Sequence, residues 1–204
     1  MGIEKGLVVV IGGTSGAGKA TVMWKLLGMY PDMFEHIVST TSRTPRAGEV
    51  EGIHYNFVTE DAFKKLLDGG ILAEYTYRHG NYYGISKDNI NRILEKGKIP
   101  IVDADYKAVV GLKEHGYNVA SFYLLVDKEM VALRLKFRDD DDEMVAYRLS
   151  DFDNHFATRV HYDYHVPNVD LLTCSAEIMA IIKKRMPKMR PVKQKVSKDC
   201  YCKD

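Results

Sequence analysis

Short apolar runs alternate with longer stretches of helical periodicity along most of this chain. Strands that are covered on both faces of a parallel sheet have such nearly continuous runs, and we find them at residues 7–11, 37–40, 99–103 and 119–126. Apolar residues at helical spacing predict helices at residues 19–29, 105–115, 128–138, 144–160 and 176–186, the last capped by Ser175. This alternation predicts an α/β fold with a three-layer core around a parallel sheet.

Two segments interrupt the alternation. Residues 42–96 contain a short strand-like run, HYNFV, a helix at 59–68 that ends at two glycines, and a hairpin that turns at His79-Gly80-Asn81. This segment is predicted to be a small mixed-β subdomain inserted into the core. The second interruption is the acidic stretch RDDDDEM, and the region around it, about residues 134–159, lies where a substrate could be covered. The core is then predicted at about residues 1–41, 97–133 and 160–186.

Composition indicates one globular domain, at residues 1–186. Of the 204 residues, 46% are hydrophobic and 28% are charged, which excludes a disordered chain. No stretch approaches the roughly 18 apolar residues of a membrane span, and the N-terminal run is too short for a secretory signal. We therefore expect a cytoplasmic protein with no membrane partner. The odd cysteine count gives no disulfide framework, and two tail thiols alone do not make a zinc site: Cys174, Cys200 and Cys202.

The C-terminal end of the chain is basic. From Lys183 to Asp204 it carries nine Lys or Arg against two Asp, a net charge of +7, whereas the whole chain has a net charge of +1. A basic tail on an acidic body either contacts nucleic acid or lipid, or is a solvated end. Two helix-breaking prolines, Pro187 and Pro191, favour a flexible tail at residues 187–204, with no nucleic acid required.

The sequence GTSGAGKAT at residues 13–21 directly follows the first apolar run. Glycines at this spacing let backbone N–H groups converge on phosphate oxygens, the following helix directs its positive end at them, and Lys19 adds a charge. A strand before and a helix after are the context that this phosphate-binding loop requires. The predicted nucleotide-binding residues are Gly13, Thr14, Ser15, Gly16, Ala17, Gly18, Lys19, Ala20 and Thr21.

A second motif, STTSRTPRAGEVEGIHYNF at residues 39–57, accompanies HGNYYGIS at residues 79–86. Together with the phosphate-binding loop, these motifs resemble guanylate kinases over about residues 7–186. The resemblance implies a phosphotransferase that moves the γ-phosphate of ATP to GMP or dGMP, with Mg²⁺ as cofactor. It also implies that residues 42–96 are the GMP-binding subdomain of a P-loop α/β fold and that residues 134–159 are a short lid.

The resemblance assigns roles to individual residues. Those implied to bind the GMP phosphate are Ser39, Arg43, Arg46, Tyr55 and Tyr83, and two guanidiniums with three hydroxyls are also what a dianionic monoester requires. Glu74 is implied to accept from guanine, helped by Asp103 and Asp105, although either aspartate could instead cap the next helix. The implied catalytic residues are Lys19, Arg43 and three lid arginines, each of which could instead be an ordinary surface residue: Arg134, Arg138 and Arg148.

Four departures from the family pattern are expected to bear on rate, metal affinity and base selectivity more than on reaction class. Ala20 stands where a hydroxyl normally follows the lysine, so no metal ligand is assigned with certainty and Asp105 is a candidate through water. Ile85 stands where the family usually has Ser or Thr beside the guanine. Lys107 and Ala108 replace Gln-Gly, and RDDDDE replaces a lid that normally begins Arg-Gly.

Two alternatives to a guanylate kinase remain open at this stage. One is a non-catalytic module that keeps the GMP groove for a phosphorylated ligand, and the other is a related kinase with a different phosphorylated acceptor. Lys19, the loop glycines and the lid arginines favour an enzyme, because a pure binding module has no need of them. The sequence is compatible with a monomer or a homodimer.

Overall fold

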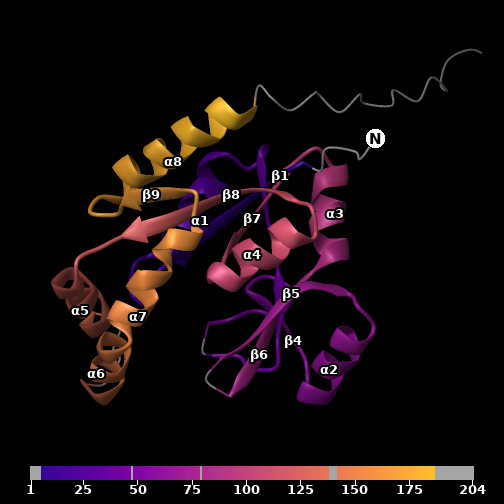
Figure 1. Cartoon of the computed structure of the whole chain (residues 1–204), viewed down its shortest axis with the longest axis horizontal. Coiled ribbons are helices and arrows are strands. Elements are labelled where there is room, and N and C mark those ends of the chain that lie inside the picture. Colours follow the sequence, from indigo (N-terminus) through magenta and orange to yellow (C-terminus); the bar gives the residue numbers. More distant parts are fainter. Residues whose placement is uncertain (1–5, 47, 79, 138–141, 187–204) are drawn as a thin grey trace, which may run out of the picture.

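The central sheet of the computed structural model is parallel throughout (Figure 1). Its middle strand β1 (Leu7–Gly13) pairs with β7 (Ile99–Asp103) on one side and with β8 (Asn118–Leu125) on the other. β2 (Phe34–His36) and β9 (Tyr164–Pro167) complete the order β2-β7-β1-β8-β9. The structure describes residues 6–46, 48–78, 80–137 and 142–186.

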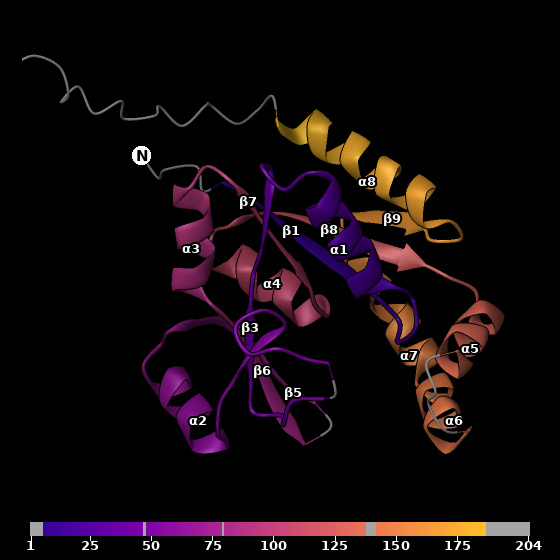
Figure 2. The same cartoon turned by 180° about the vertical axis from the view of Figure 1, so that it is seen from behind.

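Helices cover both faces of this sheet, as the two opposite views show (Figures 1 and 2). α1 (Lys19–Met29) and α8 (Leu171–Arg185) pack on one face, and α3 (Lys87–Glu95) and α4 (Tyr106–Glu114) pack on the other. Along β1, odd-numbered side chains join the core under α1 and α8, whereas even-numbered ones join the core under α3 and α4. Because both faces are buried, the strand is continuously apolar. The predicted α/β fold with a parallel sheet is confirmed.

A second, mixed sheet lies beside the core in the order β4-β3-β6-β5. Its strands are β3 (Ser39–Thr41), β4 (Tyr55–Phe57), β5 (Leu72–Arg78) and β6 (Asn81–Ser86), and α2 (Glu60–Asp68) accompanies it. The hydroxyl of Thr59 caps α2 by accepting from the backbone N–H of Ala62 at 3.2 Å. The helix, its glycine end and the β5–β6 hairpin follow the prediction, although His79 in the turn lies outside the described residues.

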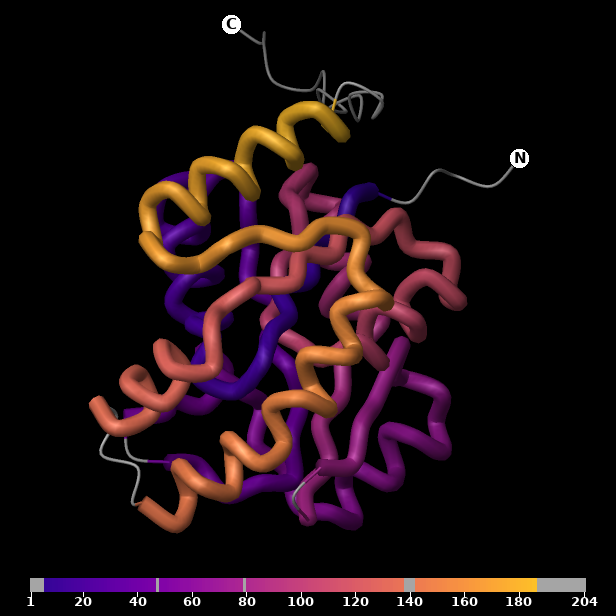
Figure 3. The backbone as a smooth tube through the Cα atoms, turned by 60° about the vertical axis from the view of Figure 1, so that its left-hand side comes forward, coloured from indigo at the N-terminus to yellow at the C-terminus, as the bar shows by residue number. Residues whose placement is uncertain are grey.

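A helical arm leaves the core after β8 and returns to it at β9. It consists of α5 (Lys128–Lys136), α6 (Asp142–Ser150), α7 (Phe152–Ala157) and a 3₁₀ turn, η1 (Thr158–His161). Figure 3 shows the arm running down one side of the molecule. No helix in the described ranges is long and apolar enough to cross a membrane.

The single helix predicted at residues 144–160 is wrong, because the chain forms α6, α7 and η1 there. Asp151 separates the first two with a φ of −92° and a ψ of 3°. Its carboxylate accepts from Asn154 at 3.1 Å and pairs with His155 at 3.1 Å. Aspartate side chains that form local hydrogen bonds favour helix ends over helix interiors, and Asp151 therefore ends one helix and begins the next. The prediction of one helix failed because the apolar spacing continues across this break.

The strand predicted at residues 37–40 is also wrong, since the chain changes sheets within it. β2 ends at His36, and β3 begins at Ser39 in the other sheet. Ile37 forms the last bond to the core sheet, donating its N–H to Ile101 O at 2.9 Å. Ile37 and Thr40 are both buried although they lie on either side of this change of sheet, so two short strands look like one apolar run.

The start of the last helix needs a correction. Asp170, not Ser175, is its cap, and the Asp170 carboxylate accepts from the backbone N–H of Thr173 at 2.7 Å. Ser175 is buried inside α8, where its hydroxyl donates to Leu171 O at 2.7 Å. The sequence interpretation also missed α3 and the four-residue strand β9, and the predicted tail at 187–204 lies outside the described residues.

Candidate active site

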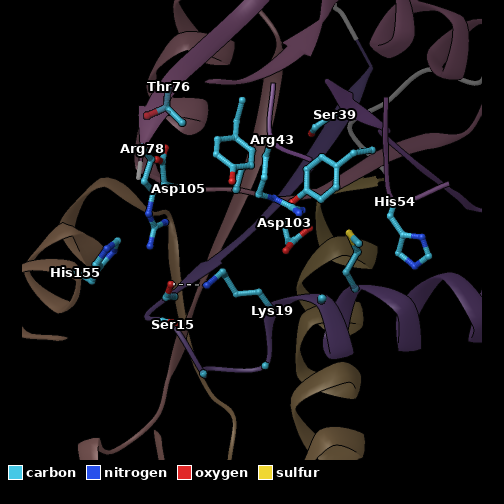
Figure 4. A pocket seen from close by; sticks show the side chains of 18 of the residues that line it. Ser15, Lys19, Ser39, Arg43, His54, Thr76, Arg78, Asp103, Asp105 and His155 are labelled. Carbon is cyan, nitrogen blue, oxygen red and sulfur yellow. Dashed lines mark hydrogen bonds between the residues drawn. The ribbon is translucent and has the colours of Figure 1, made fainter. Parts of the chain in front are cut away.

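A cavity of about 1070 Å³ opens between the carboxyl ends of β1 and β7, the second sheet and the helical arm. In doubly wound sheets, ligands bind outside the carboxyl ends of the strands. Figure 4 shows Lys19, Arg43 and Asp103 directed into one space. Ligand pockets commonly span about 300–1,000 Å³, so this cavity lies at the upper end of that range.

The phosphate-binding loop connects β1 to α1. Gly16 and Gly18 have φ values of 79° and 88°, a left-handed conformation that glycine adopts at little cost. Gly18 is the N-terminal cap residue of α1, so the loop ends on the positive end of a helix. The Nζ of Lys19 donates to Gly13 O at 3.0 Å and to Thr14 O at 2.9 Å, which holds the ammonium group across the mouth of the loop.

Two side chains brace this loop by hydrogen bonds to its backbone. Buried Asn168, which follows β9, donates from Nδ2 to Ala17 O at 2.7 Å. Arg134 of α5 donates to the same oxygen at 3.3 Å and to Asn168 O at 2.8 Å. Arg148 of α6 approaches from the arm and donates to Ser15 Oγ at 3.4 Å. Of the three predicted lid arginines, these two reach the loop, and Arg138 lies outside the described residues.

A second cationic centre lies at the second sheet. Arg43 donates from Nη2 to Glu49 Oε1 at 2.7 Å, and its guanidinium carbon lies 5.5 Å from the ring centroid of Tyr55. Burial opposes its charge, but the hydrogen bond and charge of Glu49 raise the pKa of Arg43. The other Glu49 oxygen accepts from the backbone N–H of Arg46 at 2.7 Å.

Two tyrosines lie beside this centre. The rings of Tyr55 and Tyr83 are 6.1 Å apart at their centroids, and both residues line the cavity with Ser39. Burial, with the negative charge of Asp103, raises the pKa of Tyr55 to about 12. Its hydroxyl is therefore a hydrogen-bond donor at neutral pH. The two arginines and three hydroxyls that the sequence analysis assigned to a phosphate all line this cavity.

Glu74 of β5 is a half-buried residue with one buried, unsatisfied carboxylate oxygen. Within the described part of the chain, Glu74 Oε1 has no hydrogen-bond partner. Burial, followed by the charge of Asp105, raises the pKa of Glu74 to about 8, while Lys107 opposes the shift. Gly111 on α4 leaves room for it, since a Cβ there would lie 3.0 Å from both Cβ and Cγ of Glu74. A buried acceptor without a donor in this position is poised for a ligand that brings N–H groups.

The two predicted aspartates differ in role. Asp105 caps α4, because its carboxylate accepts from the backbone N–H of Lys107 at 2.9 Å, and it also lines the cavity. Asp103 is not a cap: it ends β7 directly beside Ile11 of β1. Burial raises the pKa of Asp103 to about 6, and the positive charge of Lys19 opposes that shift.

The site offers a magnesium ion few protein ligands. No group of three or more His, Cys, Asp or Glu that could hold a metal occurs among the described residues, and Ala20 contributes no hydroxyl. Mg²⁺, however, commonly binds through one or two carboxylates, water and substrate phosphates. Asp103 beside the phosphate-binding loop fits that mode.

Sequence comparison shows which proteins share this arrangement. A family model described as guanylate kinase matches residues 5–185. The guanylate kinase of Chlamydia muridarum is 38% identical over 172 residues, 84% of this chain and 84% of the relative. The chain belongs to the guanylate kinase family.

Other guanylate kinases agree over similar lengths. That of Mycoplasmoides gallisepticum is 32% identical over 186 residues, 90% of this chain and 95% of the relative. The crystal structure of guanylate kinase from Anaplasma phagocytophilum has a TM-score of 0.73 at 25% identity and covers 92% of this chain and 89% of that one.

Most of the residues predicted from the guanylate kinase resemblance line the one cavity. Thr14 and Ala17 are buried and do not line it, and their carbonyl oxygens accept from Lys19 and Asn168. The sequence analysis did not predict several other lining residues. Two of them, Thr76 and Arg78, could have been predicted, because every second residue of β5 after Glu74 faces the same side. The missed residues of the second sheet and arm include Thr76, Arg78, Asn81, Asp151 and His155.

Proposed function

We propose that this guanylate kinase family member transfers the γ-phosphate of ATP to GMP or dGMP, with Mg²⁺ as cofactor. The observation that carries the proposal is the buried, unsatisfied Oε1 of Glu74, in the same cavity as a phosphate-binding loop. Guanine presents N1–H and N2–H₂ side by side, and a carboxylate can accept from both. Adenine lacks these donors and would leave Glu74 unpaired.

ATP is proposed to bind at the loop between β1 and α1. The backbone N–H groups of residues 13–21 and the positive end of α1 surround the phosphates. Lys19 lies across the loop and is placed to exchange its carbonyl contacts for phosphate oxygens. Arg134 and Arg148 approach from the arm, where they would stabilise charge on the phosphates during transfer.

GMP is proposed to bind against the second sheet. Arg43, Arg46, Tyr55, Tyr83 and Ser39 would hold its phosphate, and Glu74 its base, with Asp103 and Asp105 near both. Arg43 supports this placement because its buried Nε has no hydrogen-bond partner in the described part of the chain. A planar guanidinium with a donor to spare suits a phosphate oxygen.

The transfer needs no covalent intermediate with the protein. An oxygen of the GMP phosphate forms a bond to the γ-phosphorus as the bond to the β–γ bridging oxygen breaks. The electron pair of the broken bond leaves with ADP, so GMP and ATP give GDP and ADP with no net proton transfer between ionised phosphates. The residues act by aligning the two phosphates and stabilising their charge.

Mg²⁺ would supply positive charge between the donor phosphates. Asp103, which lies beside β1 at the end of β7, would hold it directly or through water, and Asp105 through water. Because Ala20 lacks a hydroxyl, substrate oxygens and water would provide most of the ligands.

The predicted division of the chain forms part of the proposal. Residues 42–96 would bind GMP, and residues 134–159 would act as a lid over ATP, both moving toward the core when substrates bind. Such closure excludes water and brings the reacting groups together.

A coupled assay tests the function. Purified protein with ATP and Mg²⁺ is offered GMP, dGMP, AMP, UMP and CMP, and ADP release is recorded. We expect turnover with GMP and dGMP only, and its loss in Lys19→Ala with GMP affinity retained. GMP binding without turnover in the parent would instead support a binding module, and preference for another phosphate ester a different acceptor.

A further inference from the structure

Three cross-strand pairs of the second sheet form a ladder along the cavity. In the antiparallel pairing of β5 with β6, Glu74 lies opposite Ile85, Thr76 opposite Tyr83, and Arg78 opposite Asn81. All six residues line the cavity. Tyr75 and Tyr77, between them on β5, are 51% and 57% exposed. Strand alternation thus places the three pairs on one face.

The ladder has a chemical order. The first pair contains Glu74, proposed to bind the base, and the second contains Tyr83, proposed to bind the acceptor phosphate. The third pair, with Arg78, is about 7 Å farther along the strand, the rise of two residues. Continuing from base to acceptor phosphate, the next group in the reaction is the phosphoryl group in transit.

The side chain of Arg78 leads toward the donor loop. Figure 4 shows it extending from β5 toward Ser15 and Lys19, on the side of the cavity where His155 lies. Its charge acts on that histidine: burial, then the positive charge of Arg78, lowers the pKa of His155. Lys19 lowers this pKa as well, whereas Asp151 and Asp105 oppose the shift. The guanidinium of Arg78 therefore lies near the arm and the donor loop, away from the base end of the ladder.

We infer that Arg78 is a further catalytic residue, which contacts the phosphoryl group as it passes from ATP to GMP. This inference rests on the proposed function. Its guanidinium would stabilise the charge that spreads over the γ-phosphoryl oxygens while one P–O bond breaks and the other forms, as described above. Arg78 approaches from the second sheet, and Lys19 and Arg148 from the opposite side of the transferred group.

The test compares Arg78→Ala, Arg78→Gln and Arg78→Lys with the parent and with Arg92→Ala. Arg92 is a matched control because it is an arginine on the surface of α3, ion-paired with Glu35 at 2.7 Å. For Arg78→Ala and Arg78→Gln we expect kcat to fall about 10²–10³-fold, the range for losing one transition-state donor. The KM for GMP should change less than threefold, and Arg78→Lys should recover part of kcat. Arg92→Ala should behave as the parent.

A binding measurement separates contact from folding effects. We would titrate each variant with GMP and with a dinucleoside pentaphosphate that joins adenosine to guanosine and so spans both phosphate sites. Arg78→Ala should lose about tenfold or more in affinity for the pentaphosphate and little for GMP.

Each outcome decides the inference. An Arg78→Ala variant with kcat and pentaphosphate affinity within threefold of an active parent would overturn it, as would a loss confined to the KM for GMP. A parent with no turnover would overturn the proposed function and this inference together. An active parent matched by active Arg78 variants would overturn this inference alone.

Discussion

Binding of GMP should release a proton from Glu74. In the free protein its carboxyl group has a pKa raised to about 8 by burial and the charge of Asp105. At pH 7 it is therefore about nine-tenths protonated, and ionising it costs about 1.4 kcal/mol, since each pKa unit corresponds to that energy. GMP selects the ionised form, because N1–H and N2–H₂ both need an acceptor.

The sign of the pH dependence follows from this shift. Below pH 8 the affinity for GMP should rise about tenfold per pH unit, and above pH 8 it should level off because the carboxylate is already formed. Isothermal titration from pH 6 to 9, in buffers of different ionisation heat, measures both the affinity and the protons released. We expect nearly one proton released per GMP at pH 7.

Glu74→Gln is the matched control, since the phosphate of GMP titrates equally in both proteins. The variant should bind GMP about 10²-fold more weakly or worse, after losing a charged hydrogen-bond acceptor. Its GMP affinity should also lack the pH dependence that Glu74 gives the parent. Without GMP, the free energy of unfolding of the parent, relative to this variant, should fall as pH rises from about 5 to 8. The reason is that the raised pKa of Glu74 makes the folded state bind its proton more tightly than the unfolded state does, an advantage that is lost as the group ionises. A parent whose GMP affinity has the same pH slope as Glu74→Gln would refute the reasoning.

Three further substitutions test other parts of the site. Ala20→Ser adds a potential metal ligand and should lower the Mg²⁺ concentration for half-maximal rate; an unchanged titration would mean that phosphates, water and carboxylates already suffice. Asn168→Ala removes the 2.7 Å bond to Ala17 O and should cost about 1–3 kcal/mol in denaturant unfolding, so unchanged stability would contradict its bracing role. Gly111→Ala places a Cβ 3.0 Å from Glu74 and should raise the KM for GMP several-fold; an unchanged KM would show that Glu74 has room to shift.

The parts of the fold that the sequence predicted are those in which local pattern and burial agree. β1 is buried on both faces and α2 begins and ends at strong cap residues, so each could be located from its own residues. One strand was wrongly predicted at residues 37–40, because the residues there stay buried or half-buried while the chain passes from the core sheet to the second sheet. Asp151 interrupts a helix without interrupting its apolar spacing, and only the fold distinguishes Asp170 from Ser175 as the cap of α8.

The residues of the candidate site that could be predicted are those that lie within a short sequence motif, where the spacing of the residues fixes their arrangement. The loop at residues 13–21 and the STTSRTPR motif both contribute charged side chains to the same cavity. The brace formed by Asn168 and the ion pair between Arg43 and Glu49 depend on folding and have no such spacing. The alternation of side chains along β5 after Glu74 could have predicted that Arg78 faces the cavity. Its proposed role could not have been predicted, because that role depends on where the donor loop lies in the fold.

The fate of a labelled γ-phosphate tests the central claim most directly. The purified protein would be incubated with Mg²⁺, GMP and ATP labelled at the γ-phosphorus, and the label would be followed in nucleotides, inorganic phosphate and protein. Direct transfer predicts label in the β-phosphate of GDP, with equal amounts of GDP and ADP and none bound to the protein. Label in inorganic phosphate, label on the protein, or no GDP at all would contradict the account.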